Sequence, residues 1–83
     1  MKIKIHPHAK QRMIERGAKE EEVIKTIGEG EKFPAKFGRV GFRRNFIFNN
    51  VWRNEKYNSK QLEVYGVEEG NEFIVITVLV KYF

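Results

Sequence analysis

His8, Arg12 and Arg16 follow one another at intervals of four residues near the amino end of the chain. On an α-helix, which turns by about 100° per residue, this spacing places the three side chains in one stripe. An imidazole beside two guanidinium groups is able to bind a phosphate and to transfer a proton near neutral pH. The same spacing fits a solvated basic face in which Glu15 pairs with a neighbouring cation, and the sequence leaves both interpretations open.

The stripe contains groups that metal-independent cleavage of RNA requires. Such a reaction needs an acid or base, cations that stabilise the phosphate in the transition state, and a further hydrogen-bond donor. His8 is the candidate acid or base, and the candidate phosphate clamp consists of Arg12, Arg16, Arg43 and Arg44. Tyr65 or Tyr82 is a candidate donor or stacking platform. The alternative for His8 is that it caps the helix or fills the seam between helix and sheet.

The positive charge of the chain is concentrated in two blocks. The 83 residues carry a net charge of +5, but residues 1–19 hold six cations against one carboxylate, and residues 31–60 hold eight against two. Such blocks offer a basic face to a polyanion, which suggests nucleic acid as the partner; a general abundance of lysine and glutamate is the alternative explanation. The candidate nucleic-acid-binding residues are Lys36, Arg39, Arg43, Arg44, Arg53 and Lys81.

Other classes of site are not indicated by the sequence. The chain has no cysteine, so it has no disulfide framework and no thiolate metal site. His6 and His8 flank a proline without a recurring ligand spacing, and there is no glycine-rich phosphate loop, so we expect neither a metal nor a cofactor. No apolar run is long enough to span a membrane and no signal peptide is recognisable, so we expect a cytoplasmic protein without membrane contacts.

Two helices are expected to position the stripe. Pro7 suits the first turn of a helix and Gly17 suits its left-handed end, which predicts a helix over residues 7–17. Glutamates at 20–22 favour the start of a second helix. Gly28 and Gly30 are expected to end it. Because the two helices are joined so tightly, they are predicted to form a helical hairpin.

Alternation of polar and apolar residues predicts a sheet. Strands are expected over residues 2–5, 40–48, 51–57, 61–67 and 73–83, with hairpin turns at 49–50, 58–59 and 69–71. In the last strand the even-numbered residues from Ile74 to Tyr82 are expected to share one face. The expected fold class is α+β, with one domain over residues 1–83 in which a two-helix hairpin packs on a twisted antiparallel sheet.

A motif runs through both predicted helices: His8-Ala9, Arg12-Met13, Glu15-Arg16-Gly17 and Glu21-Glu22-Val23. It resembles the opening signature of a family of small prokaryotic domains of unknown function, which is grouped with the RelE/ParE-like toxin superfamily. The resemblance returns at residues 75–78 of the last predicted strand. Lys19 departs from the family pattern, which has a serine or threonine cap at this position.

The resemblance implies a RelE/ParE-like toxin fold. Many members of that superfamily cleave messenger RNA without a metal, others inhibit gyrase, and each is neutralised by an antitoxin. We therefore interpret the chain as a toxin-like domain that acts on RNA, as a metal-independent ribonuclease of a toxin–antitoxin system. The alternative is a non-catalytic module on the same scaffold that binds nucleic acid or a protein. The sequence leaves open whether the chain forms a homo-oligomer.

Overall fold

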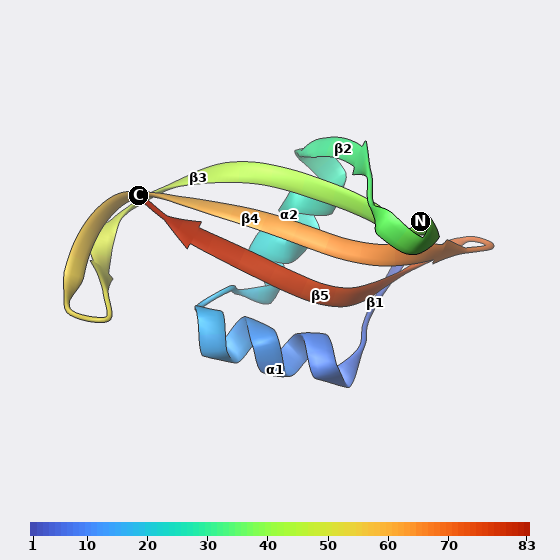
Figure 1. Ribbon diagram of the computed structural model, residues 1–83, viewed down its shortest axis with the longest axis horizontal. Helices are drawn as coiled ribbons and strands as arrows, with labels where there is room; N and C mark the ends of the chain where they lie inside the picture. Colours follow the sequence, from blue (N-terminus) through green and yellow to red (C-terminus); the bar gives the residue numbers. More distant parts are fainter.

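The computed structural model describes residues 1–83 and contains two helices and one five-stranded sheet (Figure 1). In chain order the elements are β1 (Lys2–Ile5), α1 (Pro7–Arg16), α2 (Glu20–Glu29), β2 (Glu31–Pro34), the 3-10 turn η1 (Lys36–Gly38), β3 (Val40–Trp52), β4 (Glu55–Glu69) and β5 (Glu72–Tyr82). The strands lie in the order β1-β5-β4-β3-β2. Neither α1 nor α2 has the length and the apolar character of a membrane-spanning helix.

The sheet is mixed, so the predicted antiparallel sheet is wrong. Strands β2 to β5 pair antiparallel, but β1 runs parallel to the start of β5, from Lys2 opposite Glu72 to Ile5 opposite Val75. The backbone N–H of His6 continues this pairing by donating to the Val75 carbonyl at 3.0 Å. Residue alternation indicates which side chains share a face of a strand, but it carries no information on the direction of the neighbouring strand.

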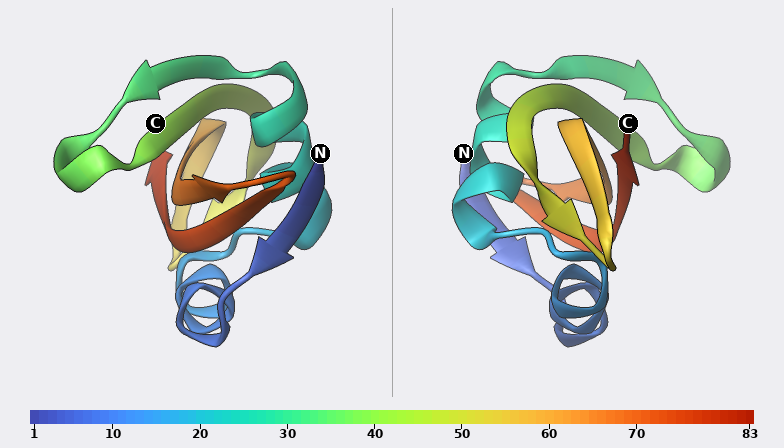
Figure 2. Two further views of the ribbon diagram at one scale, coloured as in Figure 1. Left: turned by 90° about the vertical axis from the view of Figure 1, so that its right-hand side faces the viewer. Right: turned by 90° about the vertical axis from the view of Figure 1, so that its left-hand side faces the viewer.

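The two helices are confirmed, but they do not form the predicted hairpin. α1 packs against β5, whereas α2 packs against β3 and β4. Figure 1 shows α2 passing behind β3 and β4 and α1 lying alongside β5, and Figure 2 shows the two helices apart from each other. Each helix buries its own apolar edge, Ala9 and Met13 in α1 and Val23 and Ile27 in α2, against the sheet rather than against the other helix. Gly28 lies inside α2, which ends at Gly30.

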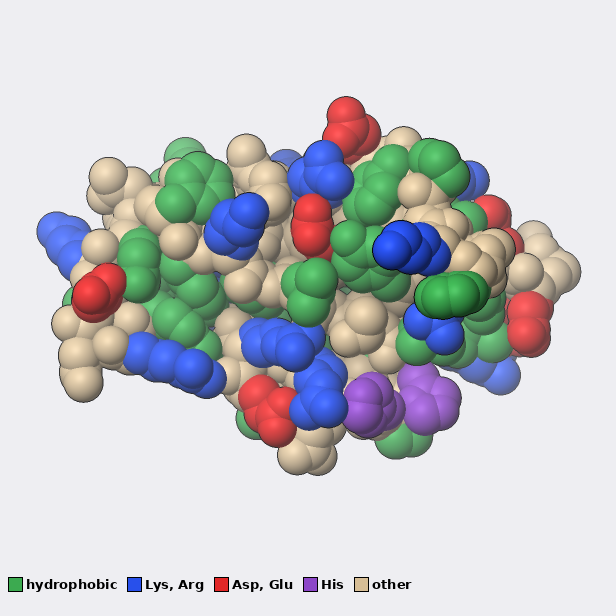
Figure 3. Space-filling model, in the orientation of Figure 1, with side chains coloured by type: hydrophobic (Ala, Val, Ile, Leu, Met, Phe, Trp, Pro, Cys, Tyr) green, Lys and Arg blue, Asp and Glu red, His purple; other side chains and the backbone are tan.

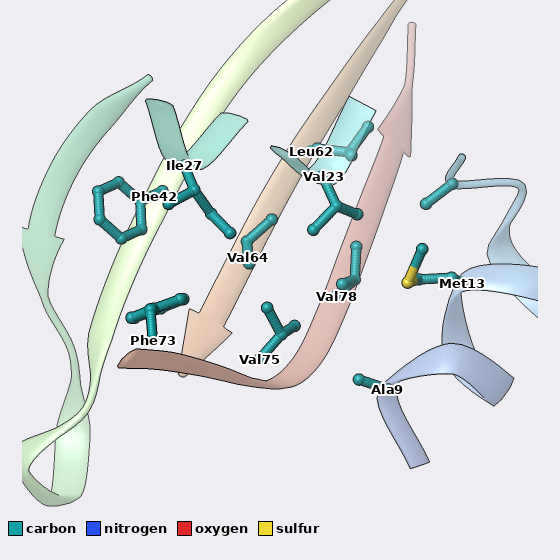
Figure 4. Close-up of a cluster of buried hydrophobic side chains, with 11 residues drawn as sticks. Ala9, Met13, Val23, Ile27, Phe42, Leu62, Val64, Phe73, Val75 and Val78 are labelled. Atoms are coloured by element: carbon teal, nitrogen blue, oxygen red, sulfur yellow. The ribbon is translucent and has the colours of Figure 1, made fainter. Parts of the chain in front are cut away.

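The core lies between the helices and one face of the sheet, and it forms a single cluster of 11 buried residues (Figure 4). A bulge in β5 decides which residues face it. Tyr65 pairs with Thr77 and Gly66 with Val75, so Ile76 is an extra residue without a partner. Phe73 and Val75 are therefore buried before the bulge and Val78 after it, and the predicted alternation of even positions holds only beyond Ile76.

The hairpin of β3 and β4 is longer than predicted. The turns expected at residues 49–50 and 58–59 are absent, because both strands continue through these positions to a turn at Arg53 and Asn54, whose φ angles are 50° and 69°. Asn49, with a φ of 44°, marks an irregularity in β3 instead. The far half of the hairpin extends beyond the rest of the sheet and bends down on the left in Figure 1.

Candidate nucleic-acid interface

A small hollow of about 220 Å³ lies where α1 ends beside β5 and the tip of the hairpin, and we call it the arginine pocket. Its lining residues are Arg16, Trp52, Arg53, Leu79, Val80 and Tyr82. A guanidinium nitrogen of Arg16 donates to the Val78 carbonyl at 2.8 Å, and one of Arg53 donates to the Glu15 carbonyl at 3.0 Å. Neither arginine has a carboxylate within 4.0 Å. The charge of each guanidinium is therefore not compensated by a carboxylate, and each has further N–H donors for a ligand.

Aromatic rings form one wall of the arginine pocket. Trp52 and Tyr82 stack with their centroids 5.0 Å apart and their planes 16° from parallel, and the Arg53 guanidinium lies 5.2 Å from the centroid of the Trp52 ring. The Tyr82 hydroxyl donates to the Arg16 carbonyl at 2.9 Å. Burial, helped by the negative charge of Glu22, raises the pKa of Tyr82, so the phenol is neutral at physiological pH and remains a donor. Flat rings beside cations suit a nucleobase and its phosphates.

Lys60 supports this pocket from inside the molecule, and the sequence did not single it out. Its ammonium group donates to a Glu22 carboxylate oxygen at 2.7 Å and to the Gly17 carbonyl, and it lies 5.9 Å from the centroid of the Tyr82 ring. Only 3% of its side-chain surface is exposed. Because β4 continues through the predicted turn, Lys60 is in phase with the buried Leu62. Lys60 thus ties the connection between the helices to the hairpin.

Gly17 closes α1 where the chain passes the aromatic wall. Its φ angle is 76°, and a Cβ atom there would collide with the Tyr82 hydroxyl and the Trp52 ring. Gly17→Ala is therefore expected to lower the free energy of unfolding by about 2 kcal/mol, through the left-handed backbone and the crowded rings. Gly28→Ala is the matched control, since a Cβ atom at this helical position meets nothing within 4 Å. The control substitution is expected to raise the free energy of unfolding by about 0.5–1 kcal/mol.

Urea denaturation of both variants measures these differences as changes in midpoint at constant slope. Equal stability of Gly17→Ala and the parent chain would contradict the close packing of Gly17 against the rings.

The structure divides the four candidate catalytic residues. Arg16 and Tyr82 line the arginine pocket, but His8 is exposed two turns earlier on α1, about 12 Å from Arg16 along the helix axis. Arg12 pairs with Glu15 at 2.7 Å, and this hydrogen bond lowers the pKa of the Glu15 carboxyl. Figure 3 shows the two histidines of the chain side by side on the surface, next to basic side chains. The backbone N–H of His8 donates to Nδ1 of His6, so it is His6 that caps α1.

The candidate nucleic-acid-binding residues fall into separate places. Arg43 lies on the face of the sheet away from the helices and binds Glu63 at 3.0 Å and Glu31 at 3.3 Å, whereas Arg44 points to the opposite face and pairs with Glu29. Arg53 lies in the arginine pocket, and Lys81 lines a hollow of about 230 Å³ that shares Leu79 and Val80 with the arginine pocket. Lys36 and Arg39 line a third hollow, which also reaches Leu79.

Comparisons with protein families, with functionally described proteins and with solved structures find no match to this chain. The resemblance to the small prokaryotic domain family therefore stays a prediction.

Proposed function

We propose that this chain binds single-stranded nucleic acid, with the arginine pocket as its principal site. One observation carries the proposal: the same pocket is lined by two guanidinium groups without carboxylate partners, Arg16 and Arg53, and by two stacked aromatic rings. These rings are those of Trp52 and Tyr82. Guanidinium groups bind phosphate through several donors at once, and aromatic faces stack on bases of any sequence. A cytoplasmic location, with cellular RNA as the ligand, is part of the same proposal.

A single strand fits this site better than a duplex. The pocket is a hollow beside the edge of β5 rather than a protruding helix, and its volume of about 220 Å³ accommodates a small planar group. A base can enter such a hollow only if it is not paired and stacked inside a double helix. The pocket is thus suited to unpaired bases in loops and at ends.

Binding is the better supported of the two functions that the sequence left open. His8, the predicted acid or base, lies two helical turns before Arg16 on α1, about 12 Å along the helix axis, and does not line the arginine pocket, where the acid or base would have to act. Burial raises the pKa of Tyr82, so Tyr82 does not replace His8 as the base at neutral pH. We therefore propose a non-catalytic binding module.

A labelled single-stranded oligonucleotide, titrated with the protein at 50 and 200 mM salt and followed by fluorescence anisotropy, tests this function. With about three phosphate contacts, the affinity is expected to fall roughly 20-fold over this range, because each contact releases counterions. The matched control is the same sequence annealed into a duplex, which we expect to bind more weakly. Absence of binding to the single strand at 50 mM salt, or tighter binding to the duplex, would contradict the proposal.

A further inference from the structure

The largest hollow of the molecule lies on the face of the sheet that carries no helix, and we call it the outer hollow. Its volume is about 460 Å³, within the range of about 300–1,000 Å³ that is usual for ligand sites. The side chains that matter here are Phe33, Lys36, Phe37, Arg39, Tyr65 and Leu79. In the view of Figure 1 this face of the sheet is turned to the reader, with α2 passing behind β3 and β4.

Two of its rings are held in place by the sheet. Phe33 of β2 lies against Gly41 of β3 so closely that a Cβ atom at Gly41 would collide with the ring. Phe33 also meets Tyr65 edge to face, with centroids 5.8 Å apart, and the Arg43 guanidinium lies 4.5 Å from its centroid. The floor of the outer hollow is therefore a preformed aromatic surface.

A third ring is free. Phe37 is 89% exposed, and its backbone has a φ angle of 62°, which is unfavourable for a residue with a bulky side chain. A large apolar ring presented to solvent on a strained turn gains nothing from the core of this molecule. Its flat face is available for stacking on a base.

The charge around the outer hollow favours an anionic ligand. Arg43, near the centre of the sheet, is neutralised by Glu31 and Glu63. Lys36 and Arg39, by contrast, have no carboxylate within 4.0 Å. A site that combines aromatic surfaces with unpaired cations matches a base together with its phosphate.

The outer hollow adjoins the arginine pocket at one residue of β5. Leu79, which is 41% exposed, lines both, while Thr77 lines the outer hollow and Tyr82 lines the arginine pocket. The five residue steps between Thr77 and Tyr82 on β5 correspond to about 17 Å. At the spacing of about 3.4 Å between stacked nucleotides, one strand spans this distance in about five steps.

We propose that the outer hollow is a second base-binding subsite, which takes a nucleotide several positions away on the same strand that occupies the arginine pocket. This inference rests on the proposed function. Phe37 and Tyr65 provide the stacking surfaces, and Lys36 and Arg39 bind the adjoining phosphates.

The test compares a trinucleotide with a decanucleotide of the same base composition, by anisotropy at 50 mM salt. The trinucleotide reaches only one subsite, whereas the decanucleotide reaches both. Phe37→Ala is expected to lower the affinity for the decanucleotide about 10-fold or more, because one stacked base is lost. The affinity for the trinucleotide, which binds at the arginine pocket, is expected to stay unchanged. Ile47→Ala is the matched control, because Ile47 is 88% exposed on the same face of the sheet but lines neither hollow.

Two outcomes separate the inference from the proposed function. If Phe37→Ala binds the decanucleotide as tightly as Ile47→Ala does, the second subsite is refuted while the arginine pocket stands. If the parent chain binds neither oligonucleotide, both proposals fail. Tight binding of an acidic peptide that Phe37→Ala abolishes, with decanucleotide binding intact, would assign the outer hollow to a protein partner and overturn the inference.

Discussion

Replacing Lys60 with methionine is expected to lower the free energy of unfolding by about 3–5 kcal/mol. The substitution keeps the length of the side chain but removes the cation that pairs with Glu22 at 2.7 Å in an almost fully enclosed position. The Glu22 carboxylate then loses its only cationic partner, and the Gly17 carbonyl loses the Lys60 donor. Since a domain of this size has a total stability of only about 5–15 kcal/mol, the variant is expected to melt at a clearly lower temperature.

Two further variants make this expectation specific to the buried pair. Lys56→Met changes an exposed lysine of the same strand and should alter stability by less than about 0.5 kcal/mol. Adding Glu22→Gln to Lys60→Met should restore part of the loss, because the amide oxygen still accepts from the Lys19 N–H and no charge is left unpaired. Urea denaturation measures the free energy of unfolding of Lys60→Met, of Lys56→Met and of the double variant. Equal stability of Lys60→Met and Lys56→Met would show that the pair contributes nothing.

Arg53→Glu is expected to weaken binding of a single-stranded decanucleotide about 100-fold. The change removes one guanidinium from the arginine pocket and places a carboxylate where it can neutralise Arg16. The fold should tolerate it, because Arg53 is exposed at the hairpin tip. Lys25→Glu is the matched control, since it changes the net charge equally at an exposed position on α2. If both variants bind equally weakly in the anisotropy assay, overall charge rather than the pocket governs the affinity.

Local signals in the sequence predicted the helices well and the sheet only in part. Pro7 and Gly17 mark the ends of α1, as expected from their backbone preferences. The asparagines at 49–50 suggested a turn because asparagine tolerates positive φ, yet Asn49 adopts this conformation within a strand, and the turn forms at Arg53. The parallel pairing of β1 depends on a contact across most of the chain, which no local pattern encodes.

The candidate site was predicted in the same partial way. Helical spacing placed Arg16 in one stripe with His8 and Arg12, but it had no means of showing that Trp52 and Arg53 of a distant hairpin line the same pocket as Arg16. Lys60 falls between the turn predicted at residues 58–59 and the strand predicted from residue 61, and its burial becomes evident only once β4 is known to continue through this position. Residues brought together by a long hairpin are not adjacent in any sequence pattern.

The fluorescence of Trp52 tests the central claim most directly, because it is the only tryptophan of the chain and its ring lines the arginine pocket. Titration of the protein with an unlabelled single-stranded oligonucleotide is expected to change the Trp52 emission in a saturable way, with the same midpoint as the anisotropy curve and with the same loss of affinity at higher salt. Binding seen by anisotropy without any change in the Trp52 emission would place the nucleic acid elsewhere on the surface and contradict the account.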